Sequence, residues 1–370
     1  MVTTVRSLLL VLLPLVTLPV EGQEPQQRDP FKQWDRNADG FLSPAEFPRQ
    51  LGKQLFDRID ANKDGRISRK EDDDFRARRK PGNSRERRPA RLPEGITLQR
   101  DVVYATLGER KLVLDLYLPR KKGKPLPMVV WIHGGGWKSG SKDNAAARLA
   151  PLLSKGYAAA SVSYRLSGEA IFPAAIADCK GAVRFLRAHA DQYGIDPNRI
   201  GAWGSSAGGH LVSLLGTSGD VNTWDVHRDH LEVSPRVQAV CNWFGPSDFL
   251  RMNDFPGRLD HDDANSPESR FIGGAIQDNK DKVAAANPVT YATSDDPPFL
   301  HMHGDNDQLV PFNQSELLHA SLKKSGVSTE LYRVRNGGHG FGGATQDTRE
   351  QLSSRVVRFF DQYLKQKSKP

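Results

Sequence analysis

From about residue 94 onward, short apolar segments with strand character alternate with amphipathic segments of helical length, and few folds accommodate such a rhythm. The predicted strands are rich in β-branched and aromatic residues and span 101–105, 111–119, 128–133, 158–165, 199–205, 237–244, 298–304 and 329–335. The predicted helices span 174–193, 207–217, 312–325 and 345–366. This alternation indicates an α/β fold, in which a mostly parallel sheet is flanked by helices and begins with an antiparallel hairpin.

One segment interrupts the alternation. Residues 248–297 are rich in Asp, Asn, Gly and Pro. We interpret them as an insertion above the carboxyl ends of the strands, which is where an open α/β sheet binds its ligands. The chain has 370 residues, of which 38% are apolar, so it is long enough for one large domain and a smaller one. We place the large domain at residues 94–368.

The formal net charge of +8 is concentrated in one short stretch. Residues 76–91 hold eight Arg or Lys against one Glu, whereas the rest of the chain is nearly neutral. The stretch has no aromatic residue and contains Pro81, Gly82 and Pro89. These features favour a solvated linker, which we assign to residues 76–93, over an arm that binds nucleic acid or another polyanion. We therefore expect no nucleic-acid partner.

The N-terminal segment, residues 1–22, has the pattern of a signal peptide. Arg6 precedes a short apolar run, residues 8–20, which is broken by Pro14 and Pro19. This run is shorter than the roughly 20 apolar residues that a bilayer span requires. The sequence therefore predicts cleavage near Gly22, a secreted or periplasmic location and no membrane span.

The chain contains two cysteines, Cys179 and Cys241, which lie far apart in the sequence. Their spacing matches no metal-binding or redox motif. Apolar neighbours favour two buried free thiols over a disulfide, although the sequence leaves both arrangements open.

Residues 30–75 contain a repeated acidic motif. The pattern Asp-x-Asn-x-Asp-Gly, with Glu at the twelfth position, begins at Asp35 and again at Asp60. Both matches resemble the EF-hand family, whose loops bind calcium through side chains at positions 1, 3, 5 and 12 and a backbone carbonyl at position 7. The resemblance implies a small helical segment with structural calcium, held by Asp35, Asn37, Asp39, Phe41, Glu46, Asp60, Asn62, Asp64, Arg66 and Glu71.

The spacing of the two loops departs from the usual EF-hand pattern. Only the short segment 47–59 separates Glu46 from Asp60, so the helices between the loops must be short or merged. This spacing puts conventional face-to-face pairing in doubt, while Leu42 and Ile67 at loop position 8 are placed to pair the loops through a short strand contact.

A motif of small residues lies where a predicted strand meets a predicted helix. Residues 204–208 read Gly-Ser-Ser-Ala-Gly and directly precede the helical stretch GHLVSLLG. The central serine of G-x-S-x-G stands on a tight strand-to-helix turn that exposes its hydroxyl. We therefore predict that Ser206 is a nucleophile, and that the N–H of Ala207 at the helix N-terminus donates to a developing oxyanion.

A glycine run, His133-Gly-Gly-Gly-Trp137, follows another predicted strand. Glycine allows backbone amides to approach a reacting oxygen where a Cβ would obstruct them. The run stands well before the serine motif in the chain, at a strand end, as in lipases and esterases. We predict Gly135 and Gly136 as further oxyanion donors, and His133 as a buttress of this loop.

An acid and a base should follow the serine in the order Asp, His. His339 lies in a glycine-rich loop beyond the last predicted strand, where an imidazole can reach the serine oxygen, so we predict it as the base. Asp307, after the strand at 298–304, is the preferred acid. Asp305 and Asp248 remain alternatives.

Three aromatic residues lie near predicted strand ends. Trp137, Trp243 and Phe244 are candidates for lining an acyl or sugar pocket, and the apolar core is an equally good location for them.

Five segments carry a wider resemblance: HGGGWKSGSK, YRLS, GIDPNRIGAWGSSAGGHL, HGDNDQLVPF and GGHGFG. Together they resemble the secreted bacterial esterases of the α/β-hydrolase superfamily, in the branch of feruloyl-esterase-like and acetyl-esterase-like enzymes. The resemblance covers nearly all of 94–366. It implies a Ser206-His339-Asp307 triad that hydrolyses short acyl or hydroxycinnamoyl esters, on small molecules or polysaccharide, without a catalytic cofactor.

Two other functions stay open at this point. A serine peptidase of the prolyl-oligopeptidase type shares the triad and usually adds a large propeller domain. A calcium-dependent binding or docking protein would instead use the EF-hand pair as its functional site. Ser205 stands where the related hormone-sensitive-lipase-like group typically has Asp, which places the chain outside that group.

Overall fold

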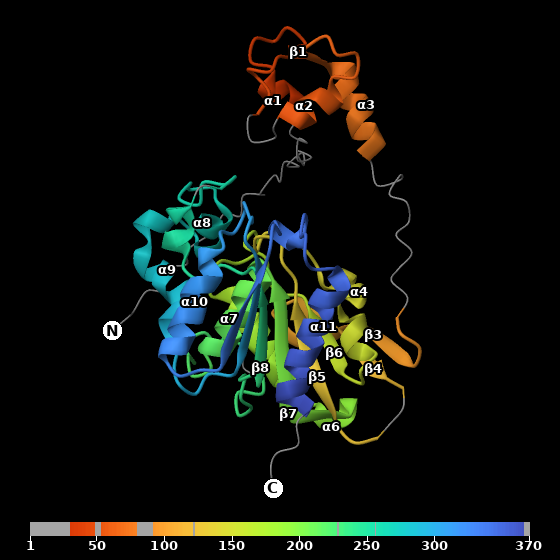
Figure 1. Cartoon of the computed structure of the whole chain (residues 1–370), viewed down its shortest axis with the longest axis vertical. Coiled ribbons are helices and arrows are strands. Elements are labelled where there is room, and N and C mark those ends of the chain that lie inside the picture. Colours follow the sequence, from red (N-terminus) through yellow and green to blue (C-terminus); the bar gives the residue numbers. More distant parts are fainter. Residues whose placement is uncertain are drawn as a thin grey trace, which may run out of the picture. The chain divides into compact units, whose positions relative to one another are not determined.

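The computed structural model describes residues 30–48, 53–79, 92–120, 123–227, 229–255 and 257–365 (Figure 1). The chain divides into two compact units, at Arg87. The predicted signal peptide and most of the predicted linker lie outside the described residues. Within the described ranges, no helix has both the length and the apolar character that crossing a bilayer requires.

The larger unit is built on an eight-stranded sheet with the order β10-β9-β8-β7-β5-β6-β4-β3. β4 pairs antiparallel with both β3 and β6, and all other neighbours are parallel. The mostly parallel sheet and its opening hairpin are therefore as predicted. The strands are β3 (Ile96–Leu107), β4 (Arg110–Pro119), β5 (Leu126–Ile132), β6 (Ala158–Val162), β7 (Ile195–Ser205), β8 (Ala239–Trp243), β9 (Phe299–Gly304) and β10 (Thr329–Val334).

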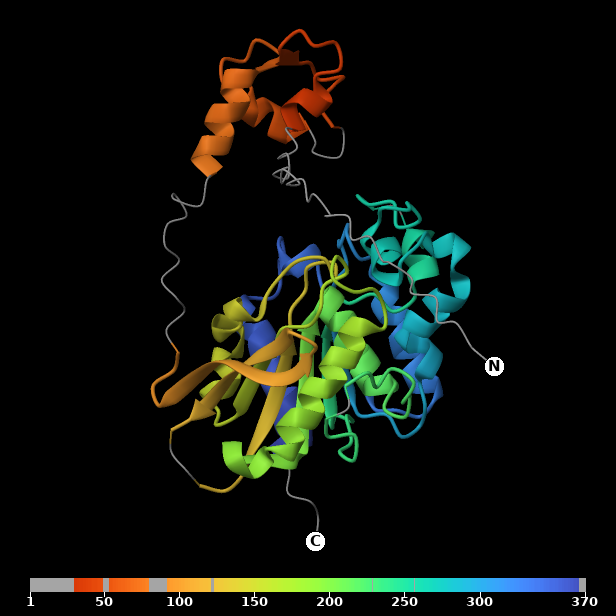
Figure 2. The same ribbon diagram turned by 180° about the vertical axis from the view of Figure 1, so that it is seen from behind.

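Helices cover both faces of this sheet (Figures 1 and 2). α5, α7 and α10 contribute to the core on one face, and α4 and α11 to the core on the other. The helices of this unit are α4 (Ala146–Leu153), α5 (Ala174–Ala188), α6 (Ala190–Tyr193), α7 (Ala207–Thr217), α8 (Pro267–Ile272), α9 (Lys280–Ala286), α10 (Asn313–Lys324) and α11 (Arg349–Phe360).

Several boundaries differ from the sequence prediction. α4 was not predicted, and the predicted helix at 174–193 is divided between α5 and α6 at His189. α11 begins at Arg349 because Thr348 and Gln351 form a capping box, in which each side chain accepts the backbone N–H of the other. The insertion at 248–297 contains α8, α9 and short 3-10 turns.

The two cores follow from side-chain alternation along the buried strands. In β5, Val130 and Ile132 face one core, whereas Val129 and Trp131 face the other. Because helices cover both faces, the strand is apolar throughout rather than alternately polar.

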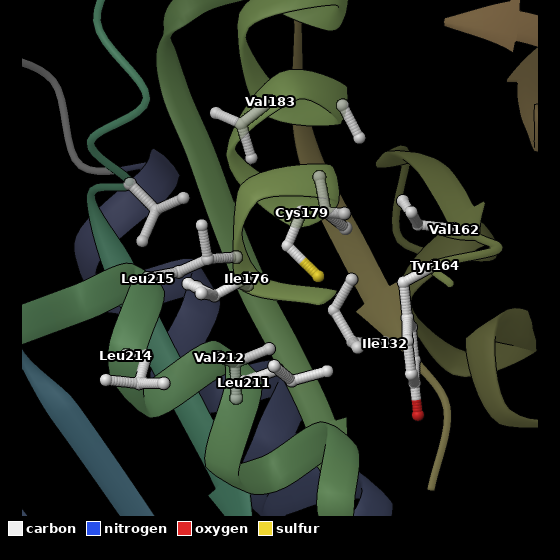
Figure 3. Packing of buried hydrophobic residues seen from close by; sticks show 14 of the residues in the cluster. Ile132, Val162, Tyr164, Ile176, Cys179, Val183, Leu211, Val212, Leu214 and Leu215 are labelled. Atoms are coloured by element: carbon white, nitrogen blue, oxygen red, sulfur yellow. The ribbon is translucent and has the colours of Figure 1, made fainter. Parts of the chain in front are cut away.

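The two cysteines are free and buried. Cys179 of α5 lies among aliphatic side chains such as Ile132 and Val183 (Figure 3), whereas Cys241 of β8 belongs to the core on the opposite face. The intervening sheet keeps the two sulfur atoms apart, which confirms the preference for free thiols.

The smaller unit consists of two helix-loop units whose loops pair. Leu42 opposes Ile67 across the antiparallel pair of β1 and β2, which confirms the predicted strand contact between the loops, and the helix between them, α2, is short as expected. The elements are α1 (Pro30–Trp34), β1 (Phe41–Leu42), α2 (Lys53–Ile59), β2 (Ile67–Ser68) and α3 (Arg69–Arg79). A small apolar core, each member at most 5% exposed, comprises Phe31, Leu42, Phe47, Phe56, Ile59 and Ile67.

Candidate active site

The strand-to-helix turn between β7 and α7 carries Ser206. Its backbone is strained for a residue with a side chain, with φ +56° and ψ −124°. The glycines around it are needed because a Cβ at Gly204 would lie 2.2 Å from the carbonyl oxygen of Gly208, and one at Gly208 would lie 2.1 Å from that of Ile132. The packing of β7, α7 and β5 thus imposes the small-residue pattern and presents the serine side chain at the turn.

Two side chains from distant loops complete a line of hydrogen bonds to this serine. His339 Nε2 lies 3.0 Å from Ser206 Oγ, and His339 Nδ1 lies 2.8 Å from Asp307 Oδ2. The carboxylate of Asp307 is fully buried, whereas the imidazole is 24% exposed. The structure thus brings the three predicted residues into contact.

The surroundings of Asp307 favour its ionised form. Burial acts to raise the pKa of this carboxyl, but its interactions with His303 and His339, which include the hydrogen bond from His339, outweigh burial and place the pKa well below its ordinary value. The backbone N–H groups of Leu309 and Val310 also donate to Asp307 Oδ1, at 2.9 and 3.0 Å. An ionised Asp307 requires the proton on His339 Nδ1, which leaves Nε2 free to accept the Ser206 proton.

The alternative acids lie in other interactions. Asp305 Oδ1 accepts the backbone N–H of Asn336 at 2.7 Å, which shapes the turn between two loops. Asp248 Oδ1 accepts the N–H of Leu250 and the side-chain amide of Asn287, and burial raises its pKa. The carboxylate that accepts the hydrogen bond from His339 Nδ1 is that of Asp307, the preferred residue.

The predicted oxyanion loop lies directly against the serine turn. A Cβ at Gly134 would lie 2.7 Å from the carbonyl oxygen of Ser205 and 3.2 Å from the Cβ of Ser206. Gly135 and Gly136 have φ of +123° and +58°, which suit glycine. The loop, with Ala207 at the start of α7, therefore has the backbone and proximity that amide donors to a tetrahedral oxygen require.

His133 braces this loop, as the sequence suggested. Its ring stacks on Tyr164 with 4.4 Å between centroids, and the Tyr164 hydroxyl donates to the His133 carbonyl at 3.0 Å. Its Nδ1 lies 2.8 Å from the carbonyl oxygen of Gly134.

Of the two locations that the sequence left open for the three aromatic residues, the structure places all of their side chains in the core. Trp137 is 1% exposed, stacks on Phe271 and donates its indole N–H to His210 at 3.2 Å. Trp243 is 3% exposed and packs in the opposite core. Phe244 is 4% exposed, and its ring meets that of His339 edge-on at 4.7 Å, so it supports the base rather than lining an open pocket.

Sequence reasoning also missed groups near the acid. His303 lies within the strand predicted at 298–304 and was given no role, yet its Nε2 lies 3.4 Å from Asp307 Oδ2. Leu309, two residues after the acid, exposes 43% of its surface although it is apolar. Neither the contact of His303 with Asp307 nor the exposure of Leu309 could be predicted from the sequence. Both depend on how the 304–311 loop folds back on β9.

The EF-hand loops have the backbone that the motif requires. Asp35 accepts the N–H groups of Asp39 and Gly40 at 3.2 and 3.0 Å, and Asp60 does the same for Asp64 and Gly65. Gly40 and Gly65 have φ of +84° and +86°. The predicted side chains at positions 1, 3, 5 and 12 are thus arranged around each turn.

The same side chains have not converged on one point. Among the described residues, no group of three or more His, Cys, Asp or Glu side chains is close enough to hold a metal ion. The position-12 carboxylates, Glu46 and Glu71, accept hydrogen bonds from Ser43 and Ser68 and from loop amides, which lower the pKa of both despite some opposition from burial. Ionised oxygen ligands on a loop of this shape fit a hard cation such as calcium.

Comparison with known proteins agrees with both units. The BD-FAE family model matches residues 114–322, and the EF-hand model matches residues 28–51 and 53–71. Esterase LipQ of Mycobacterium tuberculosis is 29% identical over 265 residues, which cover 70% of this chain and 59% of LipQ. The probable carboxylic ester hydrolase LipM of the same organism is 34% identical over 196 residues, which cover 51% and 43% of the two chains. The chain thus spans about half the length of these relatives.

Solved structures resemble the larger unit. A truncated carbohydrate esterase from gut microbiota is 33% identical, with a TM-score of 0.67, and the match covers 74% of this chain and 99% of that one. The acetyl ester-xyloside bifunctional hydrolase from Caldicellulosiruptor lactoaceticus is 25% identical, with a TM-score of 0.61 and coverage of 74% and 98%. With the sheet order, these neighbours show the α/β-hydrolase fold that the sequence predicted.

Proposed function

Because the chain belongs to the BD-FAE family, we propose that it is a serine esterase that hydrolyses carboxylic esters with short acyl or hydroxycinnamoyl groups. The observation that carries this proposal is the continuous contact from Asp307 through His339 to Ser206, at 2.8 and 3.0 Å, beside a glycine loop. A nucleophile, a base held by a buried acid, and oxyanion donors are the groups that acyl transfer requires.

The proposed mechanism uses each group once in each half-reaction. His339 Nε2 takes the proton as Ser206 Oγ attacks the ester carbonyl, and the imidazolium that forms is stabilised by Asp307. Amides of Gly135, Gly136 and Ala207 donate to the tetrahedral oxyanion. His339 then protonates the leaving alcohol, and it later activates the water that releases the acid from the acyl-enzyme.

The matched pair Ser206→Ala and Ser205→Ala tests this proposal. Both serines lie in the same turn, but only Ser206 contacts His339. We expect Ser206→Ala to lower kcat on p-nitrophenyl acetate by about 10⁴-fold or more, while Ser205→Ala stays within about threefold of the wild type. Substantial turnover by folded Ser206→Ala, or a wild type inactive on all graded p-nitrophenyl esters, would contradict the assignment.

We further propose that the natural substrate is an acylated polysaccharide. The support comes from two structural neighbours, a carbohydrate esterase and an acetyl ester-xyloside bifunctional hydrolase. Comparing acetylated xylan with methyl ferulate separates acetyl from hydroxycinnamoyl specificity, and p-nitrophenyl esters of increasing length measure the acyl limit. Failure to release acid from any acylated glycan, with p-nitrophenyl acetate still cleaved, would restrict the proposal to small esters.

For the smaller unit, we propose structural calcium. Loop one would hold the ion through Asp35, Asn37, Asp39, Glu46 and the Phe41 carbonyl, and loop two through Asp60, Asn62, Asp64, Glu71 and the Arg66 carbonyl. Calcium would neutralise the clustered carboxylates and tie each loop to its helices. The six buried apolar side chains already fill the core between the hands, which favours a stabilising role over the opening of a groove for a partner.

A location outside the cytoplasm also belongs to the proposal. It rests on the signal-peptide pattern of residues 1–22. Expression of the full chain, followed by N-terminal sequencing of the protein from the periplasm and medium, tests it. A protein that stays in the cytoplasm with residues 1–22 intact would contradict it.

A further inference from the structure

The carboxylate of Asp307 lies between two imidazoles, only one of which the proposed mechanism uses. On the side away from His339, His303 Nε2 lies 3.4 Å from Asp307 Oδ2. His303 belongs to β9 and is completely buried, and its other contacts are specific: Nε2 lies 2.9 Å from the carbonyl oxygen of Val310, and Nδ1 lies 2.8 Å from Ser315 Oγ.

These contacts fix where the His303 proton lies. A carbonyl oxygen only accepts, so Nε2 must carry hydrogen in either protonation state of the ring. The Nε2–H of His303 donates to the carbonyl oxygen of Val310. The same edge of the ring faces Asp307 Oδ2, at a distance too long for a full hydrogen bond. Ser315 is fully buried in the first turn of α10, and its hydroxyl can donate to Nδ1, which holds the ring plane.

The same residues form a closed ring of interactions around the carboxylate of Asp307. The N–H of Val310 donates to Asp307 Oδ1, the carbonyl of Val310 accepts from His303, and His303 faces Asp307 Oδ2. The carboxylate therefore has little freedom to rotate, because one oxygen is held by two backbone amides and the other lies between two imidazoles.

We propose that His303 is a positioning residue for the Asp307–His339 pair, and that Ser315 sets the orientation of the His303 ring. A line of polar side chains then runs from Ser315 through His303, Asp307 and His339 to Ser206. His303 touches no reacting atom. It acts by holding Oδ2 in the direction of His339 Nδ1 and by sharing the negative charge of that oxygen, in a buried site where such interactions are strong.

The proposal rests on the proposed esterase function, and the chain offers a matched control. His301 lies two residues earlier on β9, is equally buried, and stacks on Phe299 rather than meeting the acid. The test therefore compares His303→Leu, which removes the donor, with His303→Gln, whose amide can still donate to Val310 and Asp307, and with His301→Leu.

We expect His303→Leu to lower kcat on p-nitrophenyl acetate by roughly 10- to 100-fold with KM within about twofold, because the base is no longer held in line. The acid limb of kcat/KM should move to higher pH by roughly 0.5 to 1 unit. Without the second donor, the negative charge of Asp307 is less shared, so it stabilises the protonated imidazole of His339 more strongly. His303→Gln should recover most of kcat, and His301→Leu should stay within about twofold of the wild type.

Two results would overturn the proposal: wild-type kcat in folded His303→Leu, or equal losses in the Leu and Gln variants with an unmoved pH profile. If His303→Leu does not fold, Ser315→Ala tests the proposal instead. It removes the hydroxyl that orients the His303 ring, so kcat should fall by about threefold and the acid limb should move in the same direction. An unchanged Ser315→Ala profile would then reject the proposal.

A spectroscopic readout separates this inference from the esterase assignment. The low-field proton NMR resonance of the His339 Nδ1–H bonded to Asp307 should shift in His303→Leu and stay in place in His301→Leu. If the resonance behaves in this way in the two variants while the wild type hydrolyses no ester, the proposed function is rejected and His303 keeps its role as the positioning residue. A resonance that is unmoved in His303→Leu would reject the role of His303.

Discussion

Replacing Gly135 by alanine should disable the proposed oxyanion loop while leaving the triad intact. The carbonyl oxygen of Gly135 accepts the N–H groups of Lys138 and Ser139 at 3.2 and 3.1 Å, and the Ser139 hydroxyl at 3.0 Å, which together form a tight turn. A Cβ at this position would lie 2.1 Å from the carbonyl oxygen of Ser139 and 2.6 Å from its carbonyl carbon. Both partners are backbone atoms, so the turn itself must open.

The size of the effect follows from two terms. The φ of +123° strains any side chain, which costs about 1 to 3 kcal/mol of folding free energy. To relieve the contact between the new Cβ and the Ser139 carbonyl, the backbone of the turn must move by about 1 Å. The amides of Gly135 and Gly136 move with it. Loss of one oxyanion donor lowers kcat by about 10²- to 10³-fold, or roughly 2.7 to 4 kcal/mol of transition-state stabilisation.

Steady-state hydrolysis of p-nitrophenyl acetate, with thermal unfolding measured in parallel, tests this expectation. Gly168→Ala is the matched control, because it lies in the neighbouring loop, has no atom within 4 Å of its added Cβ and no positive φ. The control should keep kcat within about twofold and should not lose stability. A folded Gly135→Ala variant with kcat within threefold of the wild type would refute the assignment of this loop.

Further predictions concern the acid, a buried lysine and the calcium loops. Asp307→Asn should lower kcat by about 10⁴-fold, because it favours the wrong tautomer of the base, while Asp248→Asn stays within about threefold; the opposite ranking would make Asp248 the acid. Burial lowers the pKa of Lys180 to about 8, so between pH 8 and about 10.5 the unfolded chain binds more protons than the folded one. The free energy of unfolding should therefore rise across that window by about 1 to 3 kcal/mol more in the wild type than in Lys180→Met, and equal slopes in denaturant titrations would contradict this. Glu46→Gln and Glu71→Gln should weaken calcium binding in calorimetry without changing kcat, and a parallel loss of turnover would show that calcium acts on the active site.

Much of this arrangement could be predicted because local rules dictate it. G-x-S-x-G between a strand and a helix has few conformations open to it, so the position of Ser206 followed from the motif alone. The chain order of acid and base then left few candidates, and the structure brings Asp307 and His339 into contact with that serine. Their catalytic role stays a prediction until the variants above are measured.

Other features depended on packing that no local pattern encodes. Trp137 and Trp243 stand near strand ends, like residues that line pockets, but helices close over both faces of the sheet and bury them. The pairing of the two EF-hand loops is different, because the strand contact between Leu42 and Ile67 was predicted from their places at loop position 8.

Local sequence patterns were enough to predict the layered α/β architecture, the strained serine turn and the two acidic loops, since each arises from contacts between residues near in the chain or from a repeating period. The tertiary structure alone decided which aspartate faces His339, that His303 lies on its far side, and that the cysteines are separated by the sheet. Those outcomes depend on distances between segments that lie far apart in the chain, and such distances are set by the joint packing of all the strands and helices between them.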